Sequence, residues 1–201
     1  MLDKSIPYKS LVMRRPPEAL PAERPLPAGF SFRRFQPGDE AHWARLETAV
    51  AEFASERDAR AYFAERFLPH EALLRARCCF VCAPDGLPVS TATAWEEGGV
   101  RLLHWVSTLP AFQRRGLGRA VVLHALHSYP PEASPSPIWL GTQTWSHDAI
   151  LLYDALGFRL VRAGTHPAAH SPNCFAEGME VLRTVYPPEV FARLLARSLP
   201  A

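Results

Sequence analysis

Apolar and polar residues alternate with a period of two in several short stretches, which is the pattern of half-buried strands. In residues 29–35, for example, Phe30, Phe32 and Phe35 are apolar anchors separated by polar positions. Closely spaced runs broken by the turn residues Pro84, Asp85 and Gly86 predict an antiparallel meander. The predicted strands cover residues 8–14, 29–35, 72–83, 88–95, 100–109, 138–144, 158–162 and 175–183.

A second set of segments has apolar residues three or four positions apart, as one face of a helix requires. Ser146 is suited to cap one of these helices, and Gly157 is suited to end it in a left-handed conformation. Prolines interrupt residues 16–27, which we therefore expect to form a stiff connector. The predicted helices cover residues 41–53 and 56–67, a stretch beginning near residue 116, residues 146–157, and a C-terminal segment beginning at residue 187.

The most informative stretch is Gln-Arg-Arg-Gly-Leu-Gly-Arg-Ala at residues 113–120, between a predicted strand and a predicted helix. Glycines at such a turn leave backbone N–H groups accessible, and the helix N-terminus favours an anion, so the turn can hold a phosphate. A P-loop needs Lys and then Ser or Thr where this chain has Arg119 and Ala120. A Rossmann turn needs a third glycine where this chain has Val121, so the segment matches neither motif. A tight turn with two solvated arginines is the alternative.

A second informative segment, Ala-Ile-Leu-Leu-Tyr-Asp-Ala-Leu-Gly-Phe, follows the first along the chain at residues 149–158. Together, the two segments resemble the GCN5-related N-acetyltransferase (GNAT) superfamily over residues 29–183. The resemblance implies an α/β (α+β) fold: a mixed sheet of about seven strands, splayed at a cofactor cleft and flanked by about four helices. We expect residues 1–28 to form an extra N-terminal strand and arm, and residues 29–201 to form a single domain with a C-terminal helix.

The resemblance also implies acetyl-CoA as the acyl donor, with roles for three parts of the chain. The pyrophosphate would bind backbone N–H groups of Arg114, Arg115, Gly116, Leu117, Gly118 and Arg119. The end of the preceding strand, at Val106, Ser107 and Thr108, would hold the pantetheine arm and the thioester carbonyl. Tyr153 matches the family tyrosine that protonates the departing thiolate, although a core aromatic is the simpler interpretation. Ser146 lies where the family often has a cofactor-binding asparagine, or it is only a helix cap.

The group that takes the proton from the amine is less defined. His104 is a candidate because its pKa is ordinarily near neutral, and Glu96 or Glu97 could serve instead. Some family members that acetylate protein N-termini carry a glutamate at the position of Gly141, so this chain departs from that pattern. Candidate residues for an acceptor pocket are Trp105, Trp145, His166 and His170, and Cys174 lacks an evident base that would make it a nucleophile.

Composition argues against a nucleic-acid-binding protein, a membrane-spanning protein and a metal site. Among the 201 residues, 48% are apolar and 21% are charged, and the net charge of +2 gives no basic face for nucleic acid. No apolar run is long enough to span a membrane, and we expect a cytoplasmic protein. Cys78, Cys79 and Cys82 lie in a run that predicts a buried strand, so no metal site is assigned.

The predicted activity is acetyl transfer to a primary amine of a small molecule or peptide. A noncatalytic acyl-CoA-binding module that regulates a partner is the alternative from another class. Strand edges in the N-terminal arm and in residues 175–183 could pair between subunits, which would give a homodimer.

Overall fold

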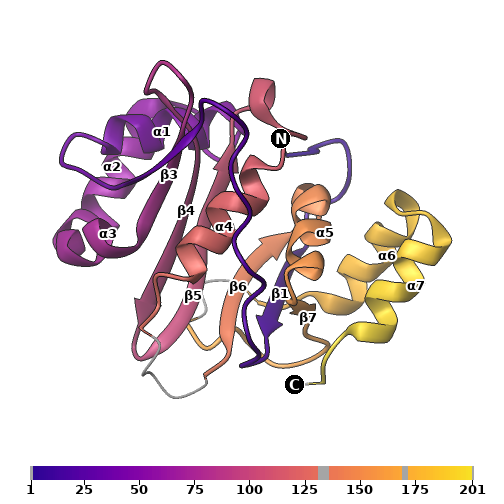
Figure 1. Cartoon of the computed structure of the whole chain (residues 1–201). Coiled ribbons are helices and arrows are strands. Elements are labelled where there is room, and N and C mark those ends of the chain that lie inside the picture. Colours follow the sequence, from indigo (N-terminus) through magenta and orange to yellow (C-terminus); the bar gives the residue numbers. More distant parts are fainter. Residues whose placement is uncertain (1, 131–135, 169–171, 201) are drawn as a thin grey trace. The chain divides into compact units, whose positions relative to one another are not determined.

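The computed structural model describes residues 2–130, 136–168 and 172–200. Within these residues the strands form one mixed sheet in the order β2-β3-β4-β5-β6-β1-β7, and seven α-helices accompany it (Figure 1). The strands are β1 (Ser10–Arg15), β2 (Ser31–Arg34), β3 (Cys78–Cys82), β4 (Pro88–Glu97), β5 (Val100–Thr108), β6 (Ile138–Gln143) and β7 (Arg159–Leu160). The helices are α1 (Glu40–Ala49), α2 (Glu56–Arg66), α3 (Glu71–Arg77), α4 (Leu117–Leu126), α5 (His147–Ala155), α6 (Phe175–Val185) and α7 (Pro188–Arg197).

The chain divides into two compact units. The first contains residues 20–95 and the described residues from 103 onwards to 130. The second contains residues 2–19, 96–102 and the described residues from 136 to 200. Strand β5 contributes its first three residues to the second unit and the others to the first. None of the helices formed by the described residues is long and apolar enough to cross a bilayer.

In the first unit, β3 pairs antiparallel with β4, which confirms the first pairing of the meander predicted over residues 72–109, and β2 pairs antiparallel with β3. The single strand predicted at residues 72–83 is wrong in its first half, because residues 71–77 form α3. That segment, Glu-Ala-Leu-Leu-Arg-Ala-Arg, consists of strong helix formers, and Arg75 pairs with Glu71 one turn earlier (Nη2–Oε1 2.7 Å). Helix propensity therefore outweighs the apolar run until the buried residues of β3 begin.

The core of the first unit is aromatic where the two N-terminal helices pack. The rings of Trp43 on α1 and Phe63 on α2 lie 4.9 Å apart, and Phe35 stacks on Phe63 at 5.7 Å. All three side chains are buried. Helix α4 packs on β3 and buries seven of its ten residues, so its first turn has a fixed position in this unit.

In the second unit, β1 lies inside the sheet and pairs antiparallel with both β6 and β7. Its side chains Leu11, Val12 and Met13 are at most 3% exposed. The prediction that the N-terminal strand offers an edge to another subunit is therefore wrong, and this argument for a homodimer falls. Strand β5 pairs with β6 in the parallel sense, Arg101 with Ile138 and Leu102 with Trp139, as the GNAT resemblance implies.

The strand predicted at residues 175–183 is also wrong, because the segment forms helix α6. Its buried residues Gly178, Met179 and Leu182 recur at three- and four-residue intervals, which is the helical period rather than the strand period. Gly178 lies so close to Leu11 that an added Cβ would stand 2.7 Å from Leu11 Cδ2. The C-terminal helix is confirmed as α7, and the described residues form seven helices instead of the predicted four and a C-terminal helix because α3 and α6 were not predicted.

Candidate functional site

The end of β5 is fixed by side chains from the neighbouring strand and the following turn. The hydroxyl of Ser90, on β4, donates to the Ser107 carbonyl (2.9 Å) and lies 2.7 Å from Thr108 Oγ1. Gln113 Nε2 donates to the Thr108 carbonyl at 2.9 Å. These contacts hold the backbone of residues 107–108, the stretch predicted to bind the pantetheine arm. Ser90 was not predicted, because its role depends on a pairing between strands.

The turn after β5 has an uncommon backbone. Arg114 has φ +61° and Gly116 has φ +82°, so two of three successive residues are left-handed. An added Cβ at Gly116 would meet no atom within 4 Å, so the glycine is required by its backbone angle and not by crowding. When left-handed residues alternate with right-handed ones, successive backbone N–H groups point toward one side. Such a concave arrangement of N–H groups, called a nest, binds anions.

The first turn of α4 leaves N–H groups without acceptors. Its first internal hydrogen bond runs from Ala120 N to Gly116 O (3.0 Å), and no side chain caps the helix. Within the described parts of the chain, the amides of Leu117 and Gly118 have no hydrogen-bond acceptor. The helix N-terminus adds about half a positive charge here. The residues therefore fit a phosphate group, as predicted for the turn at residues 114–119, which we call the cradle.

The two arginines of the turn differ in their surroundings. The Arg115 guanidinium lies over the rings of Phe30 (4.8 Å) and Phe112 (5.6 Å), which also contact each other edge to face. Arg114 is exposed at the left-handed position. Arg115 is exposed as well, so both arginines are solvated, and the planar group of Arg115 also lies against two aromatic faces.

Strand β5 itself is distorted at Trp105. This residue has φ +49°, a left-handed conformation that bulky side chains rarely adopt. Its ring lies 5.2 Å from Trp43, 5.5 Å from Phe53 and 5.4 Å from Tyr62. Aromatic packing from the first two helices thus holds the distorted residue in place, beside the Val106–Thr108 stretch.

A buried carboxyl, Glu47 on α1, belongs to the same region. Its side chain is 1% exposed, and burial raises its pKa to about 8. The nearby Ser107 hydroxyl opposes this rise, and the charge of Glu52 adds to it. Glu47 was not among the residues predicted for the site. The available signal was its position one turn after Trp43 on the apolar face of the predicted helix.

The three candidates named for the proton acceptor lie in different environments. His104 is half-buried on β5, and its ring contacts those of Phe67 (5.7 Å) and Trp105 (5.6 Å). Glu96 and Glu97 are exposed at the end of β4. Of these three, His104 alone belongs to the first unit, where the cradle is.

Tyr153 lies on α5 in the second unit and is 7% exposed. Its ring packs edge to face on Phe158 at 6.0 Å. The helix ends as predicted: Gly157 has φ +92°, its N–H donates to Asp154 O, and Phe158 N–H donates to Tyr153 O. This is a Schellman motif, and it fixes the last turn of the helix that carries Tyr153.

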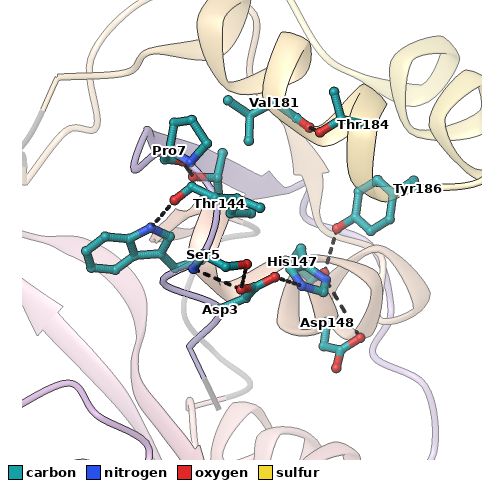
Figure 2. Close-up of polar contacts among 11 residues, drawn as sticks. Asp3, Ser5, Pro7, Thr144, His147, Asp148, Val181, Thr184 and Tyr186 are labelled. Atoms are coloured by element: carbon teal, nitrogen blue, oxygen red, sulfur yellow. Dashed lines mark hydrogen bonds and ion pairs between the residues drawn. The ribbon is translucent and has the colours of Figure 1, made fainter.

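Ser146 precedes α5, but its side chain makes no capping hydrogen bond, so that part of the prediction is wrong. Other residues hold the start of the helix (Figure 2). The Tyr186 hydroxyl donates to the His147 carbonyl (2.6 Å), and His147 Nε2 lies 3.5 Å from the Asp3 carboxylate. The Thr144 hydroxyl donates to Pro7 O (2.6 Å), so N-terminal residues anchor this segment.

The remaining pocket candidates in the second unit make structural contacts. The Trp145 indole N–H donates to Ile6 O (2.8 Å), and its ring packs on Tyr8. His166 contacts the ring of Trp139 at 6.0 Å. His170 lies outside the described residues.

The cysteines of β3 are buried, as predicted. Burial raises the pKa of Cys78 to about 11 and that of Cys79 to about 12, so both thiols stay protonated at neutral pH. Among the described residues, no group of three or more His, Cys, Asp or Glu side chains is placed to hold a metal ion. Cys174, half-buried, precedes α6.

Comparison with known proteins identifies the family of the chain. The model of the acetyltransferase (GNAT) family matches residues 40–158, which include the cradle and Tyr153. Comparison with curated proteins gave no match.

Several solved structures share the fold. A GCN5-related N-acetyltransferase from Sphaerobacter thermophilus is 21% identical, with a TM-score of 0.62 over 77% of this chain and 49% of that one. A GNAT-family acetyltransferase from Colwellia psychrerythraea is 12% identical, with a TM-score of 0.56 over 77% and 54%. A GCN5-related N-acetyltransferase from Kribbella flavida is 23% identical, with a TM-score of 0.51 over 75% and 54%. This chain thus covers about half the length of each. Because the family model spans more than half of the sequence, the chain belongs to the acetyltransferase (GNAT) family.

Proposed function

We propose that the protein transfers an acetyl group from acetyl-CoA to a primary amine. The observation that carries the proposal is the uncapped start of α4, where the Leu117 and Gly118 amides have no acceptor among the described residues. Left-handed Arg114 and Gly116 lead into it. A diphosphate supplies the oxygen acceptors that such a cluster of amides needs, and its negative charge matches the helix N-terminus.

The end of β5 would orient the acyl donor. Ser90 and Gln113 fix the backbone of Ser107 and Thr108. The main-chain groups of Ser107 and Thr108 therefore present a constant geometry to a bound thioester. A backbone N–H directed at the thioester carbonyl contributes a few kcal/mol by stabilising charge that develops on the oxygen. Fixed geometry matters because positioning of amine and thioester supplies much of the remaining rate acceleration.

Tyr153 is proposed as the acid that protonates the departing thiolate. The support is its place in the family motif and the well-defined helix end at Gly157 that sets its position in the second unit. A phenol has an ordinary pKa near 10, which suits proton donation to a thiolate leaving group at neutral pH.

The test combines acetyl-CoA binding with an amine panel. Calorimetric titration measures the affinity for CoA, and release of the free CoA thiol measures turnover with amino acids, polyamines, arylalkylamines and peptides. Gly116→Val is the diagnostic variant, and Gly86→Val is its matched control. The two glycines have φ +82° and +84°, and neither would bring an added Cβ within 4 Å of another atom. Both substitutions therefore cause similar backbone strain.

We expect Gly116→Val to weaken CoA binding at least tenfold and Gly86→Val to leave it unchanged, while both lower the melting temperature by a similar amount. Equal affinity in the two variants would refute the cradle. CoA binding without acetylation of any amine in the panel would instead support the noncatalytic acyl-CoA-binding module.

A further inference from the structure

Two residue pairs from α1 and β5 occupy the same part of the first unit. Trp43 and Glu47 are four residues apart on α1 and therefore share one helix face. Trp105 and Ser107 are two residues apart on β5. The two tryptophan rings lie 5.2 Å apart, and the Ser107 hydroxyl is the neighbour that acts on the Glu47 carboxyl. The carboxyl and the hydroxyl are thus neighbours between α1 and β5.

These polar groups are buried without satisfying one another. Glu47 Oε1, Ser107 Oγ and Trp105 Nε1 each have no hydrogen-bond partner among the described residues, and Glu47 and Ser107 are 1% and 4% exposed. Each unpartnered buried polar atom costs free energy, and a carboxyl costs most. The Glu47 carboxyl on α1 is buried beside the hydroxyl of Ser107, which belongs to the Val106–Thr108 stretch of β5. Such a carboxyl is suited to holding a proton.

The same strand residue, Trp105, also belongs to an aromatic patch. The rings of Phe53, Tyr62 and Trp105 lie 5.4 to 5.5 Å from one another, and all three side chains are half-buried. Their exposed faces offer an apolar surface that also attracts cations. A protonated amine on an aromatic or aliphatic body matches both properties.

We propose that Glu47 receives the proton of the acceptor amine through the Ser107 hydroxyl, and that the acceptor carries an apolar body that packs on Phe53, Tyr62 and Trp105. This inference rests on the acetyl transfer proposed above. The ammonium gives one proton to Ser107 Oγ while the Ser107 proton passes to Glu47. The amine nitrogen then forms a bond to the thioester carbon as the C–S bond breaks. The second nitrogen proton goes to the departing CoA thiolate, which becomes the thiol, and Glu47 releases its proton to solvent.

The groups around Glu47 set the pH at which this relay works. Its titratable neighbours are Glu52, just after α1, and Cys78 on β3, whose thiol stays protonated at neutral pH. Burial and the charge of Glu52 both favour the protonated carboxyl. We therefore expect kcat/KM to rise with pH up to about 8, as Glu47 ionises and becomes able to accept a proton.

The experiment compares wild type, Glu47→Gln, Ser107→Ala and the double variant, with phenethylamine, spermidine and a short peptide as acceptors. Thr48→Val is the matched control, because Thr48 Oγ1 is also buried without a partner on α1. For wild type we expect phenethylamine to be the best of the three acceptors. Each single variant should lose about 10²-fold in kcat/KM and lose the rise toward pH 8, the double variant should lose no more, and CoA affinity should not change. Thr48→Val should keep the wild-type profile.

Several results would overturn this inference while leaving the proposed function intact. They are a preference for spermidine or peptide over phenethylamine, an unchanged pH profile in Glu47→Gln, or additive losses in the double variant. If Glu47→Gln does not fold, quenching of tryptophan fluorescence by phenethylamine in wild type decides the position of the acceptor. Saturable quenching that Phe53→Ala abolishes supports the aromatic patch, and its absence refutes it. Failure of CoA binding in wild type would instead refute the proposed function itself.

Discussion

Replacing Glu47 by glutamine should stabilise the folded protein at alkaline pH. In the folded state burial raises the pKa of Glu47 to about 8, whereas the unfolded chain has the ordinary value of 4.5. Between these values the folded state binds more protons than the unfolded state, so the free energy of unfolding falls as pH rises. The stabilising difference is fully present below pH 4.5 and is lost by about pH 8. Glutamine keeps the shape of the side chain and cannot ionise.

The size of this effect on the free energy of unfolding follows from the difference between the folded and unfolded pKa values of Glu47, which is about 3.5. At 1.36 kcal/mol per pKa unit this gives a ceiling of about 5 kcal/mol for the destabilisation of wild type by ionised Glu47. Even one third of that value moves the melting temperature by about 5 °C in a chain of this size. The effect is therefore large enough to measure by scanning calorimetry.

The assay compares the melting temperatures of wild type, Glu47→Gln and Thr48→Val at pH 5, 7 and 9. At pH 5 we expect wild type and Glu47→Gln to differ little, because the carboxyl is protonated in the folded state. At pH 9 Glu47→Gln should melt several degrees higher, and Thr48→Val should follow the wild-type pH dependence. Parallel curves for wild type and Glu47→Gln from pH 5 to 9 would refute the reasoning, because they would mean that Glu47 is ionised throughout.

Three other predictions concern the donor site and the helix that carries Tyr153. Tyr153→Phe should lower kcat about 10²-fold at unchanged CoA affinity, whereas Tyr186→Phe, a change at an equally buried tyrosine, should cost stability but not kcat. Steady-state kinetics and calorimetric titration check this pair, and equal kcat in both variants would exclude the acid role. Gly157→Ala should lower the free energy of unfolding by about 1–2 kcal/mol in urea titrations, because φ is +92° and the new Cβ would lie 3.3 Å from Arg15 Nε. CoA affinity should decrease as salt rises from 50 to about 500 mM, and a flat response would contradict binding of the phosphates by charge.

The turn before α4 and the end of α5 were predictable from the sequence because both depend on local backbone chemistry. Gly116 and Gly157 adopt left-handed angles, and a glycine at such positions is visible without knowledge of the fold. The errors at residues 72–77 and 175–183 have a different origin. Both segments are short and rich in apolar residues, and such segments satisfy the period of a strand or of a buried helix about equally well. Tertiary packing, such as Gly178 against Leu11, decides between them.

The contacts that hold the candidate site were less predictable. Ser90 acts on Ser107 and Thr108 only because β4 and β5 are neighbours. Glu47 lies on a helix face that was predicted to be buried, but a pattern of apolar positions does not show which group a glutamate on that face would meet. Ser107, the hydroxyl neighbour of Glu47, is 60 residues further along the chain, and only the fold brings the two side chains together.

Backbone strain in the described chain is concentrated around this site. The non-glycine residues with positive φ are Ala51, Trp105 and Arg114, and each adjoins an element with a proposed role. Ala51 follows α1, where Glu52 N–H donates to the Glu47 carbonyl (3.0 Å). Trp105 precedes the Val106–Thr108 stretch, and Arg114 precedes the uncapped start of α4.

Such conformations cost about 1–3 kcal/mol each and persist where the surrounding structure imposes them, most often at functional sites. A fold selected for stability alone would relax these residues and would not bury a carboxyl oxygen without a hydrogen-bond partner beside them. Strain at three points and the buried Oε1 of Glu47 therefore support one interpretation: the first unit is built to present β5 and the start of α4 to a ligand. Substitution by glycine separates strain from function, because Ala51→Gly and Arg114→Gly should each raise stability by up to about 1 kcal/mol. A loss of stability in both variants would show that these backbone angles are not strained.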